Sequence, residues 1–90
     1  MNLLQTRANT TIKEQIDKIK EEVAEVEEAI ANEESAERIC SEILDIIQAA
    51  ITLGEKFEIN STDIEIHSIK LIAYELQGKL EIIKGDDQFE

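Results

Sequence analysis

Two pairs of acidic residues, each with its members three positions apart, are the residues of this chain best suited to chemistry. Glu22 and Glu25 form the first pair, and Glu42 and Asp45 form the second. On a helix, residues three apart lie on the same side, so two neighbouring helices would bring the four carboxylates together. Four anions need a cation between them, and oxygen ligands favour a hard ion. The sequence therefore predicts a site for Mg2+, or for Mn2+ in its place, that would hold a phosphate substrate.

The same acidic residues have a plainer interpretation as a solvated helix surface. Glutamate is a strong helix former, and in a chain with 21 acidic residues some pairs three apart are inevitable. Glu27, Glu28, Glu33 and Glu34 fit this interpretation, and Glu21 points more nearly outward than its neighbours. The two pairs above differ because they flank apolar positions, where partial desolvation makes unpaired charge costly. A function is one reason to keep charge in such a place.

Two helices separated by a short turn are expected to carry these pairs. The first begins at Thr11, because Thr11 and Glu14 have the spacing of a capping box. Residues 32–35 form the turn, and the second helix runs from about Ser35 to about Gly54. An apolar stripe flanks the acidic pair on each helix. The stripe of the first helix advances by four and three residues, through Ile12, Ile16, Ile19, Val23, Val26 and Ile30.

A third helix is expected after a connector over residues 57–61. Thr62 and Glu65 again have capping-box spacing, and the helix that they open is expected to end near Gly85. The apolar stripe of this helix consists of Ile69, Ile72, Leu76, Leu80 and Ile83.

The expected fold is all-α, with three helices per chain. The second helix is apolar around roughly half its circumference, so contacts from more than one side are needed to cover it. Three helices of one short chain do not enclose a site. We therefore expect a four-helix-bundle core that oligomerisation completes, in a homodimer or a tetramer. The chain itself is expected to comprise a flexible N-terminal arm (residues 1–10), one helical domain (residues 11–85) and an acidic tail (residues 86–90).

The first two helices also repeat one local pattern. A shift of 20 residues superimposes the two acidic pairs and the apolar stripes beside them. Two such helices, lying antiparallel, would face a common cleft with their carboxylate flanks. The residues in register are Ile19 with Ile39, Glu22 with Glu42, Val23 with Ile43, Glu25 with Asp45, Val26 with Ile46 and Ala29 with Ala49.

The composition excludes several classes of function. The chain has 90 residues, 42% of them hydrophobic, no proline and a formal net charge of -12. That charge repels nucleic acid, and no cluster of basic residues offsets it. No apolar run approaches the length that spans a membrane, and the single cysteine, Cys40, gives no disulfide within one chain. We therefore expect a cytoplasmic protein that binds neither nucleic acid polymers nor membranes.

The acidic pairs, taken with their neighbours, resemble a known motif. Residues 21–25 have the sequence EEVAE and residues 42–45 have the sequence EILD, which fit the pattern EExxE followed by ExxD. This pattern resembles the signature of the all-α NTP pyrophosphatases, a superfamily that includes MazG, the dimeric dUTPases and phosphoribosyl-ATP pyrophosphatase. The resemblance covers about residues 12–53, and the chain looks most similar to the small MazG-like proteins of bacteria and their phages.

The resemblance implies a hydrolase activity and roles for the acidic residues. Enzymes of this kind hydrolyse a ribo- or deoxyribonucleoside triphosphate between its α- and β-phosphates, giving the monophosphate and pyrophosphate. Carried over by position, Glu25 or Glu22 would be the catalytic base that activates water. The ligands of the Mg2+ ion would be Glu22, Glu25, Glu42 and Asp45.

Two cationic residues are candidate phosphate contacts under the same resemblance. Arg38 lies one turn before Glu42, where related domains carry a lysine, although a surface ion pair with Glu34 is an equal alternative. Lys70 belongs to a His-x-x-Lys-Leu run that small MazG-like proteins often have on the next helix. The histidine of that run, His67, is more often a surface or packing residue than a ligand.

Two other functions fit the sequence. An acidic helical bundle of this kind can be a non-catalytic oligomerisation or interaction module. A relative that has lost turnover can still bind a nucleotide together with its metal. The aromatic residues available to stack on a base are few, namely Phe57, Tyr74 and Phe89.

Overall fold

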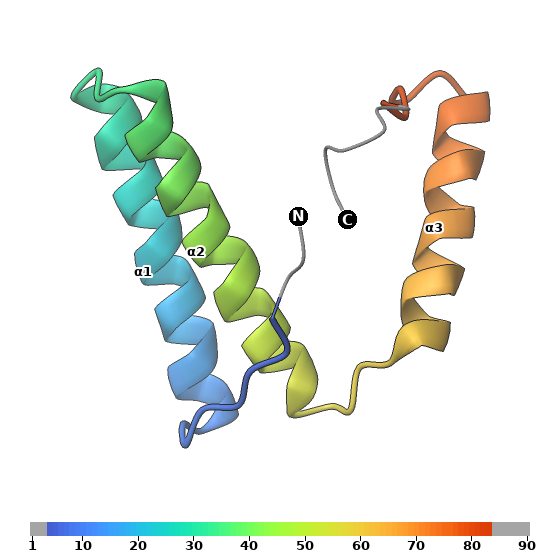
Figure 1. The fold of residues 1–90 in the computed structure, drawn as a ribbon, viewed down its shortest axis with the longest axis horizontal. Helices are drawn as coiled ribbons and strands as arrows, with labels where there is room; N and C mark the ends of the chain where they lie inside the picture. Colours follow the sequence, from blue (N-terminus) through green and yellow to red (C-terminus); the bar gives the residue numbers. More distant parts are fainter. Residues whose placement is uncertain (1–3, 84–90) are drawn as a thin grey trace. The chain divides into compact units, whose positions relative to one another are not determined.

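The computed structural model describes residues 4–83, which divide into two compact units, residues 4–58 and residues 59–83. Regular structure in this part of the chain is entirely helical (Figure 1). The first unit contains α1 (Ile12–Ala31) and α2 (Ala36–Glu55), which pack side by side as an antiparallel hairpin. The second unit contains α3 (Ser61–Leu76). The predicted all-α class and the three helices are confirmed.

Both helices of the hairpin begin where the sequence predicts. Thr11 caps α1, and Glu14 accepts a hydrogen bond from the backbone N–H of Thr11 at 2.8 Å, which completes the capping box. Ser35 caps α2 by accepting a hydrogen bond from the backbone N–H of Arg38 at 3.2 Å. The turn between the helices places Glu33 in the left-handed region at φ 52°. The two helices are therefore joined closely enough to lie against each other along their length.

The start of α3 differs from the prediction. Asn60 caps the helix and Asp63 closes the capping box, so the predicted pair of Thr62 and Glu65 was wrong. The side-chain oxygen of Asn60 accepts hydrogen bonds from the N–H groups of Thr62 at 2.9 Å and Asp63 at 3.1 Å. Asparagine is the stronger N-cap residue because its carbonyl reaches these N–H groups readily, so it prevails over the threonine that follows it.

The end of α3 also differs from the prediction. The helix ends at Leu76, and Gly78 then adopts φ +75°, a conformation that glycine takes without steric cost. The N–H of Lys79 donates to the carbonyl of Tyr74 at 2.9 Å, which closes a Schellman motif. Leu80 and Ile83 consequently lie beyond the helix, although the predicted stripe placed them on it. The predicted end near Gly85, like the acidic tail over residues 86–90, lies outside the described residues.

The contact between α1 and α2 is made by small and polar side chains. On α1 the buried residues are Gln15, Glu22 and Ala29, which are seven residues apart. A seven-residue spacing keeps one narrow line of a helix against its partner. The buried residues of α2 are Glu42, Ala49 and Thr52. Among the described residues the only buried hydrophobic side chains are those of Ala29 and Ala49.

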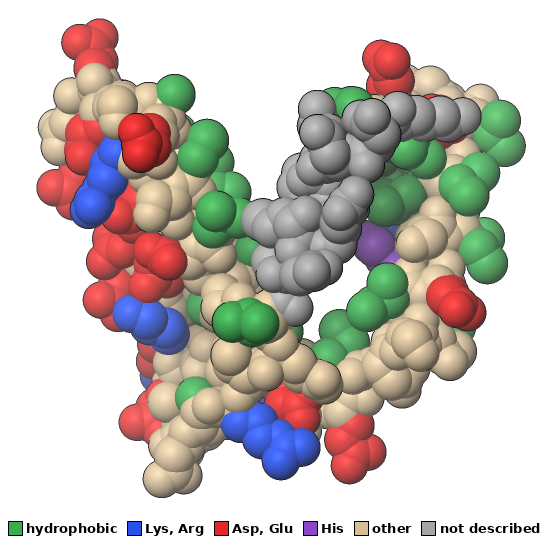
Figure 2. Space-filling view, in the orientation of Figure 1, with side chains coloured by type: hydrophobic (Ala, Val, Ile, Leu, Met, Phe, Trp, Pro, Cys, Tyr) green, Lys and Arg blue, Asp and Glu red, His purple; other side chains and the backbone are tan. Residues whose placement is uncertain are grey.

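The large apolar side chains lie at the surface instead. On α1, Ile12 is 46% exposed and Ile30 is 57% exposed. On α3, Ile69 is 67% exposed, and no residue of this helix is buried. Figure 2 shows such hydrophobic side chains along α2 and α3. None of the helices within residues 4–83 combines the length and the apolar character needed to cross a lipid bilayer.

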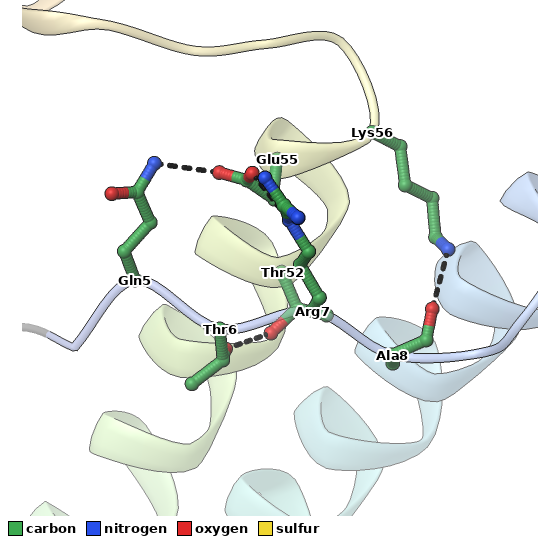
Figure 3. A network of polar contacts seen from close by, with 7 residues as sticks. All are labelled: Gln5, Thr6, Arg7, Ala8, Thr52, Glu55 and Lys56. Carbon is green, nitrogen blue, oxygen red and sulfur yellow. Dashed lines mark hydrogen bonds and ion pairs between the residues drawn. The ribbon is translucent and has the colours of Figure 1, made fainter.

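The segment before α1 contacts the C-terminal half of α2 (Figure 3). Glu55 accepts hydrogen bonds from Gln5 at 2.6 Å and Arg7 at 2.9 Å. The Lys56 ammonium donates to the carbonyl of Ala8 at 3.0 Å. The predicted flexibility of residues 1–10 stays a prediction, of which residues 1–3 lie outside the described part. These contacts nevertheless give residues 5–10 a defined path beside the hairpin.

Candidate metal centre

Three of the predicted carboxylates meet between α1 and α2. Glu22, Glu42 and Asp45 each offer an oxygen atom, and these atoms lie within 4.8 Å of one another. Glu22 is 6% exposed and Glu42 is 7% exposed, whereas Asp45 is exposed. We call these three residues the carboxylate cluster. One helix of the hairpin contributes Glu22 and the other contributes the remaining two, so the cluster depends on the packing of both.

Each buried carboxylate of the cluster has one oxygen in an ion pair and one oxygen with no partner. Glu22 Oε1 lies 2.9 Å from Lys18 Nζ, and Glu42 Oε1 lies 2.9 Å from Arg38 Nη2. The Oε2 atoms of Glu22 and Glu42 are buried without a hydrogen-bond partner. A buried charged oxygen without a partner costs free energy, and a bound cation removes that cost. The donor set, all oxygen and predominantly buried, fits a hard divalent ion such as Mg2+.

Glu25 lies beside the cluster but outside the group of three. The neighbouring carboxylates of Glu42 and then Glu22 raise the pKa of Glu25, because a carboxyl group beside other anions favours its protonated form. Hydrogen bonding with Lys18 lowers the pKa of Glu22, although burial opposes the shift. Glu25 itself is exposed. Its roles as a metal ligand and as a catalytic base stay predictions.

Two hollows adjoin the cluster. The larger, which we call the large groove, is open to solvent and has a volume of about 690 Å³. The smaller, which we call the small hollow, has a volume of about 250 Å³. The large groove runs from Glu22, Asp45 and Lys18 to Gln48, Thr52 and Thr10. The small hollow is lined by Glu25, Glu28, Ala29, Glu34, Arg38 and Glu42.

The predicted cationic residues differ in their surroundings. Arg38 pairs with Glu42 as described, and its Nε atom also lies 3.6 Å from Glu34 Oε1. The predicted surface ion pair with Glu34 is therefore present together with the contact to the cluster. Lys70 lies on α3, where its ammonium sits 5.5 Å from the centre of the Tyr74 ring. The phosphate roles of both residues stay predictions.

Sequence reasoning missed Lys18, the cation of the first helix. It is half-exposed, lines the large groove and forms the ion pair with Glu22. A signal for it was present, because a lysine four residues before a glutamate lies on the same helix face. The 20-residue shift also places Lys18 on Arg38, so the repeated pattern includes the cation. The two ion pairs are thus equivalent positions on the two helices.

Comparison of the chain with models of known protein families, with curated proteins and with solved structures finds no match.

Proposed function

We propose that the protein is a Mg2+-dependent nucleoside triphosphate pyrophosphohydrolase, with the carboxylate cluster as its metal site. The observation that carries the proposal is the pair of buried, unpartnered Oε2 atoms on Glu22 and Glu42, beside the oxygen of Asp45. Acidic residues on an ordinary exposed helix surface point into water and keep their hydration. Two glutamates held against each other at a helix contact give up that hydration, which favours a bound cation as their partner.

The hydrolysis reaction suits the residues around the cluster. A water oxygen attacks the α-phosphorus, the bond from that phosphorus to the bridging oxygen breaks, and pyrophosphate leaves. When bound, Mg2+ would neutralise phosphate charge and polarise the phosphorus centre. Glu25, whose pKa its carboxylate neighbours raise, would accept the proton of the attacking water, and Glu22 is the alternative base. The large groove has a volume within the usual range for small-molecule sites.

Oligomerisation is part of the proposal. The hairpin and α3 each leave large apolar side chains exposed, for example Ile30 at 57% and Ile69 at 67%. A second copy of the chain would cover such surfaces in a four-helix-bundle core, as a homodimer or a tetramer. Multi-angle light scattering of the full chain tests this directly. A mass equal to one chain would contradict the oligomer without touching the metal site.

Release of pyrophosphate is the measurement that tests the activity. A panel of ribo- and deoxyribonucleoside triphosphates should yield nucleoside monophosphate and pyrophosphate with Mg2+, and neither product with a chelator. The variants Glu42→Gln and Asp45→Asn should lose turnover by roughly a thousandfold, since each removes a charged ligand from the site. Glu27→Gln, an exposed residue of the same helix as Glu22, is the matched control. Full activity in either cluster variant would contradict the ligand assignment.

The exposed apolar faces favour one second candidate, a non-catalytic interaction module. A helical hairpin that only binds a partner needs no metal, so its assembly should tolerate Glu42→Gln and Asp45→Asn. A nucleotide-binding protein without turnover is intermediate between the hydrolase and the interaction module, because it would bind nucleotide with Mg2+ and release no product. Measuring the affinity for a nucleotide with and without Mg2+ separates these outcomes.

A further inference from the structure

The carboxylate cluster is built from two equivalent halves. The 20-residue shift superimposes one set of side chains on α1 and α2, namely Lys18 on Arg38, Glu22 on Glu42, Glu25 on Asp45 and Ala29 on Ala49. Because the helices are antiparallel, as Figure 1 shows, a repeated pattern gives two half-sites related by an approximate two-fold rotation. Each half-site has a cation, a buried carboxylate at 2.9 Å from it, and an acidic residue from the other helix. The first half-site opens on the large groove and the second on the small hollow.

The surroundings break this symmetry. The large groove extends past Gln48 and Ala49 to Thr52, and the arm residues Ala8 and Thr10 complete its wall. Gln48 holds the arm there, because its side-chain amide donates to Thr6 Oγ1 at 3.1 Å. The small hollow lies toward the turn between the helices and has about a third of that volume, 250 Å³ against 690 Å³. Equivalent half-sites therefore face spaces of unlike size.

A nucleoside triphosphate has two ends that are as unlike as these spaces. The nucleoside is large and partly apolar, whereas the terminal diphosphate is compact and highly charged. A volume of about 690 Å³ lies within the usual range of small-molecule sites, and 250 Å³ lies below it. Acidic side chains border both spaces, so charge does not decide which end of the nucleotide binds in which space. The difference in size between the two spaces decides it. The guanidinium of Arg38, beside the small hollow, offers the paired donors that phosphate oxygens accept.

We propose that a nucleoside triphosphate binds across the carboxylate cluster in one orientation. This inference rests on the pyrophosphohydrolase activity proposed above. The nucleoside and the α-phosphate lie in the large groove beside Lys18, and the β- and γ-phosphates lie in the small hollow beside Arg38. In this orientation the attacking water approaches the α-phosphorus from the side of the large groove, so the base that accepts its proton is Glu22, which lines that groove, and not Glu25, which lines the small hollow. Attack of water then separates the products to opposite sides. Nucleoside monophosphate keeps its contact with Lys18, and pyrophosphate, which carries away the bridging oxygen, keeps its contact with Arg38.

The test measures the affinity for each product by isothermal titration calorimetry in Mn2+, with nucleoside monophosphate and pyrophosphate titrated separately. Lys18→Met should weaken monophosphate binding by about tenfold or more, the value of a charge-assisted hydrogen bond, and leave pyrophosphate binding within about twofold. Arg38→Met should do the reverse. Lys20→Met, which removes an exposed lysine of the same helix that does not line the groove, is the matched control.

Further measurements distinguish a phosphate contact from a structural role. Titration of Mn2+ alone should give affinities in both variants at least equal to that of the unaltered chain, because each substitution removes a cation that competes for a cluster carboxylate. The charge-conserving variants Lys18→Arg and Arg38→Lys should restore most of the lost product affinity. A fall in Mn2+ affinity that parallels the loss of product affinity would instead show a structural role and overturn the proposal.

The outcomes separate this inference from the proposed function. An equal loss of affinity for both products in each variant, or the reversed pattern of affinities, would overturn the proposed orientation of the nucleotide. Failure of the unaltered chain to bind either product would overturn it as well. Absence of turnover, with the expected pattern of product affinities intact, would contradict the hydrolase activity and leave the direction of binding standing.

Discussion

The α1–α2 hairpin and α3 differ in the side chains that they bury. At its helix contact the hairpin buries polar and small residues, among them Glu22 and Glu42 with one unpartnered oxygen each. α3 buries no residue at all, and its large aliphatic side chains, like those of the hairpin, lie at the surface. A buried polar group costs free energy unless it is hydrogen-bonded or paired with an opposite charge, and a contiguous exposed apolar patch marks an interaction surface. This contrast is the reason why the proposed chemistry is placed on the hairpin, and why α3 is expected to take part in the proposed assembly.

The largest expected effect concerns Mg2+, whose stabilisation of the protein should depend on the hairpin and not on α3. At a concentration one hundred times its dissociation constant, Mg2+ should raise the free energy of unfolding by about 2.7 kcal/mol, because it binds the folded hairpin alone. Glu42→Gln should abolish this stabilisation, whereas Glu65→Gln on the exposed surface of α3 should keep it. Thermal denaturation followed by circular dichroism, with Mg2+ and with chelator, measures both. Equal stabilisation of the two variants by Mg2+ would remove the chemical distinction between the hairpin and α3.

The second effect concerns assembly through α3. Ile69→Glu should weaken oligomerisation by about 2 kcal/mol or more, since it removes an exposed isoleucine that the proposed assembly would bury and places a charge there. Ser68→Glu adds the same charge at a neighbouring exposed position and should leave the assembly unchanged. Light scattering across a dilution series gives the mass of each variant. An unchanged mass for Ile69→Glu would show that its side chain takes no part in assembly.

The arm gives a third way to sharpen the comparison, because it closes one end of the large groove. Lys56 donates to the carbonyl groups of Ala8 and Thr10, so Lys56→Met should release the arm. A loss of about 1.4 kcal/mol would speed trypsin cleavage after Arg7 roughly tenfold. Lys20→Met, which removes an exposed lysine of α1, is the control. Fast cleavage in the unaltered chain would show instead that the arm is flexible, as the sequence predicts.

Sequence patterns predicted those features that depend on local geometry. The capping-box spacing of Thr11 and Glu14 placed the start of α1, because a capping box involves residues three positions apart. The same spacing at Thr62 and Glu65 misplaced the start of α3, where Asn60 is the cap. The convergence of Glu22 with Glu42 followed from helical spacing together with a short turn. The end of α3 was missed because the apolar stripe continues to Ile83, whereas Gly78 and its left-handed turn stop the helix earlier.

The sequence could not predict which carboxylates are buried. Glu22 and Glu25 differ in burial although both flank the same stripe, because the rotation of α1 about its axis decides which of them faces α2. That rotation is set by the line of Gln15, Glu22 and Ala29, and two of these are polar residues that no hydrophobic pattern selects. Lys18 was missed for a related reason, since its importance appears only once Glu22 is known to be buried.

The smallest expected effect compares two capping boxes of the same design. Thr11→Ala on the hairpin and Asn60→Ala before α3 each remove an N-cap, which typically costs about 1 kcal/mol. Loss of the Thr11 cap should lower the free energy of unfolding measured in the cooperative transition of the hairpin, because α1 packs on α2. α3 buries no residue, so its lost cap should show mainly as fraying, seen as faster amide hydrogen exchange in its first turn.

The pH dependence of the α1 cap completes this test. Hydrogen bonding with the backbone N–H and then the side chain of Thr11 lowers the pKa of Glu14. A carboxyl group whose pKa is lower in the folded state stabilises it above the unfolded pKa, and this contribution is lost as the pH falls through the folded pKa. Unfolding measured from neutral pH into the acid range should therefore lose less stability in Glu14→Gln, which has no carboxyl group to protonate at this position, than in the unaltered chain. A parallel pH profile in the two proteins would show that the Glu14 carboxylate contributes nothing to the cap, and α1 would then depend on its packing against α2 alone.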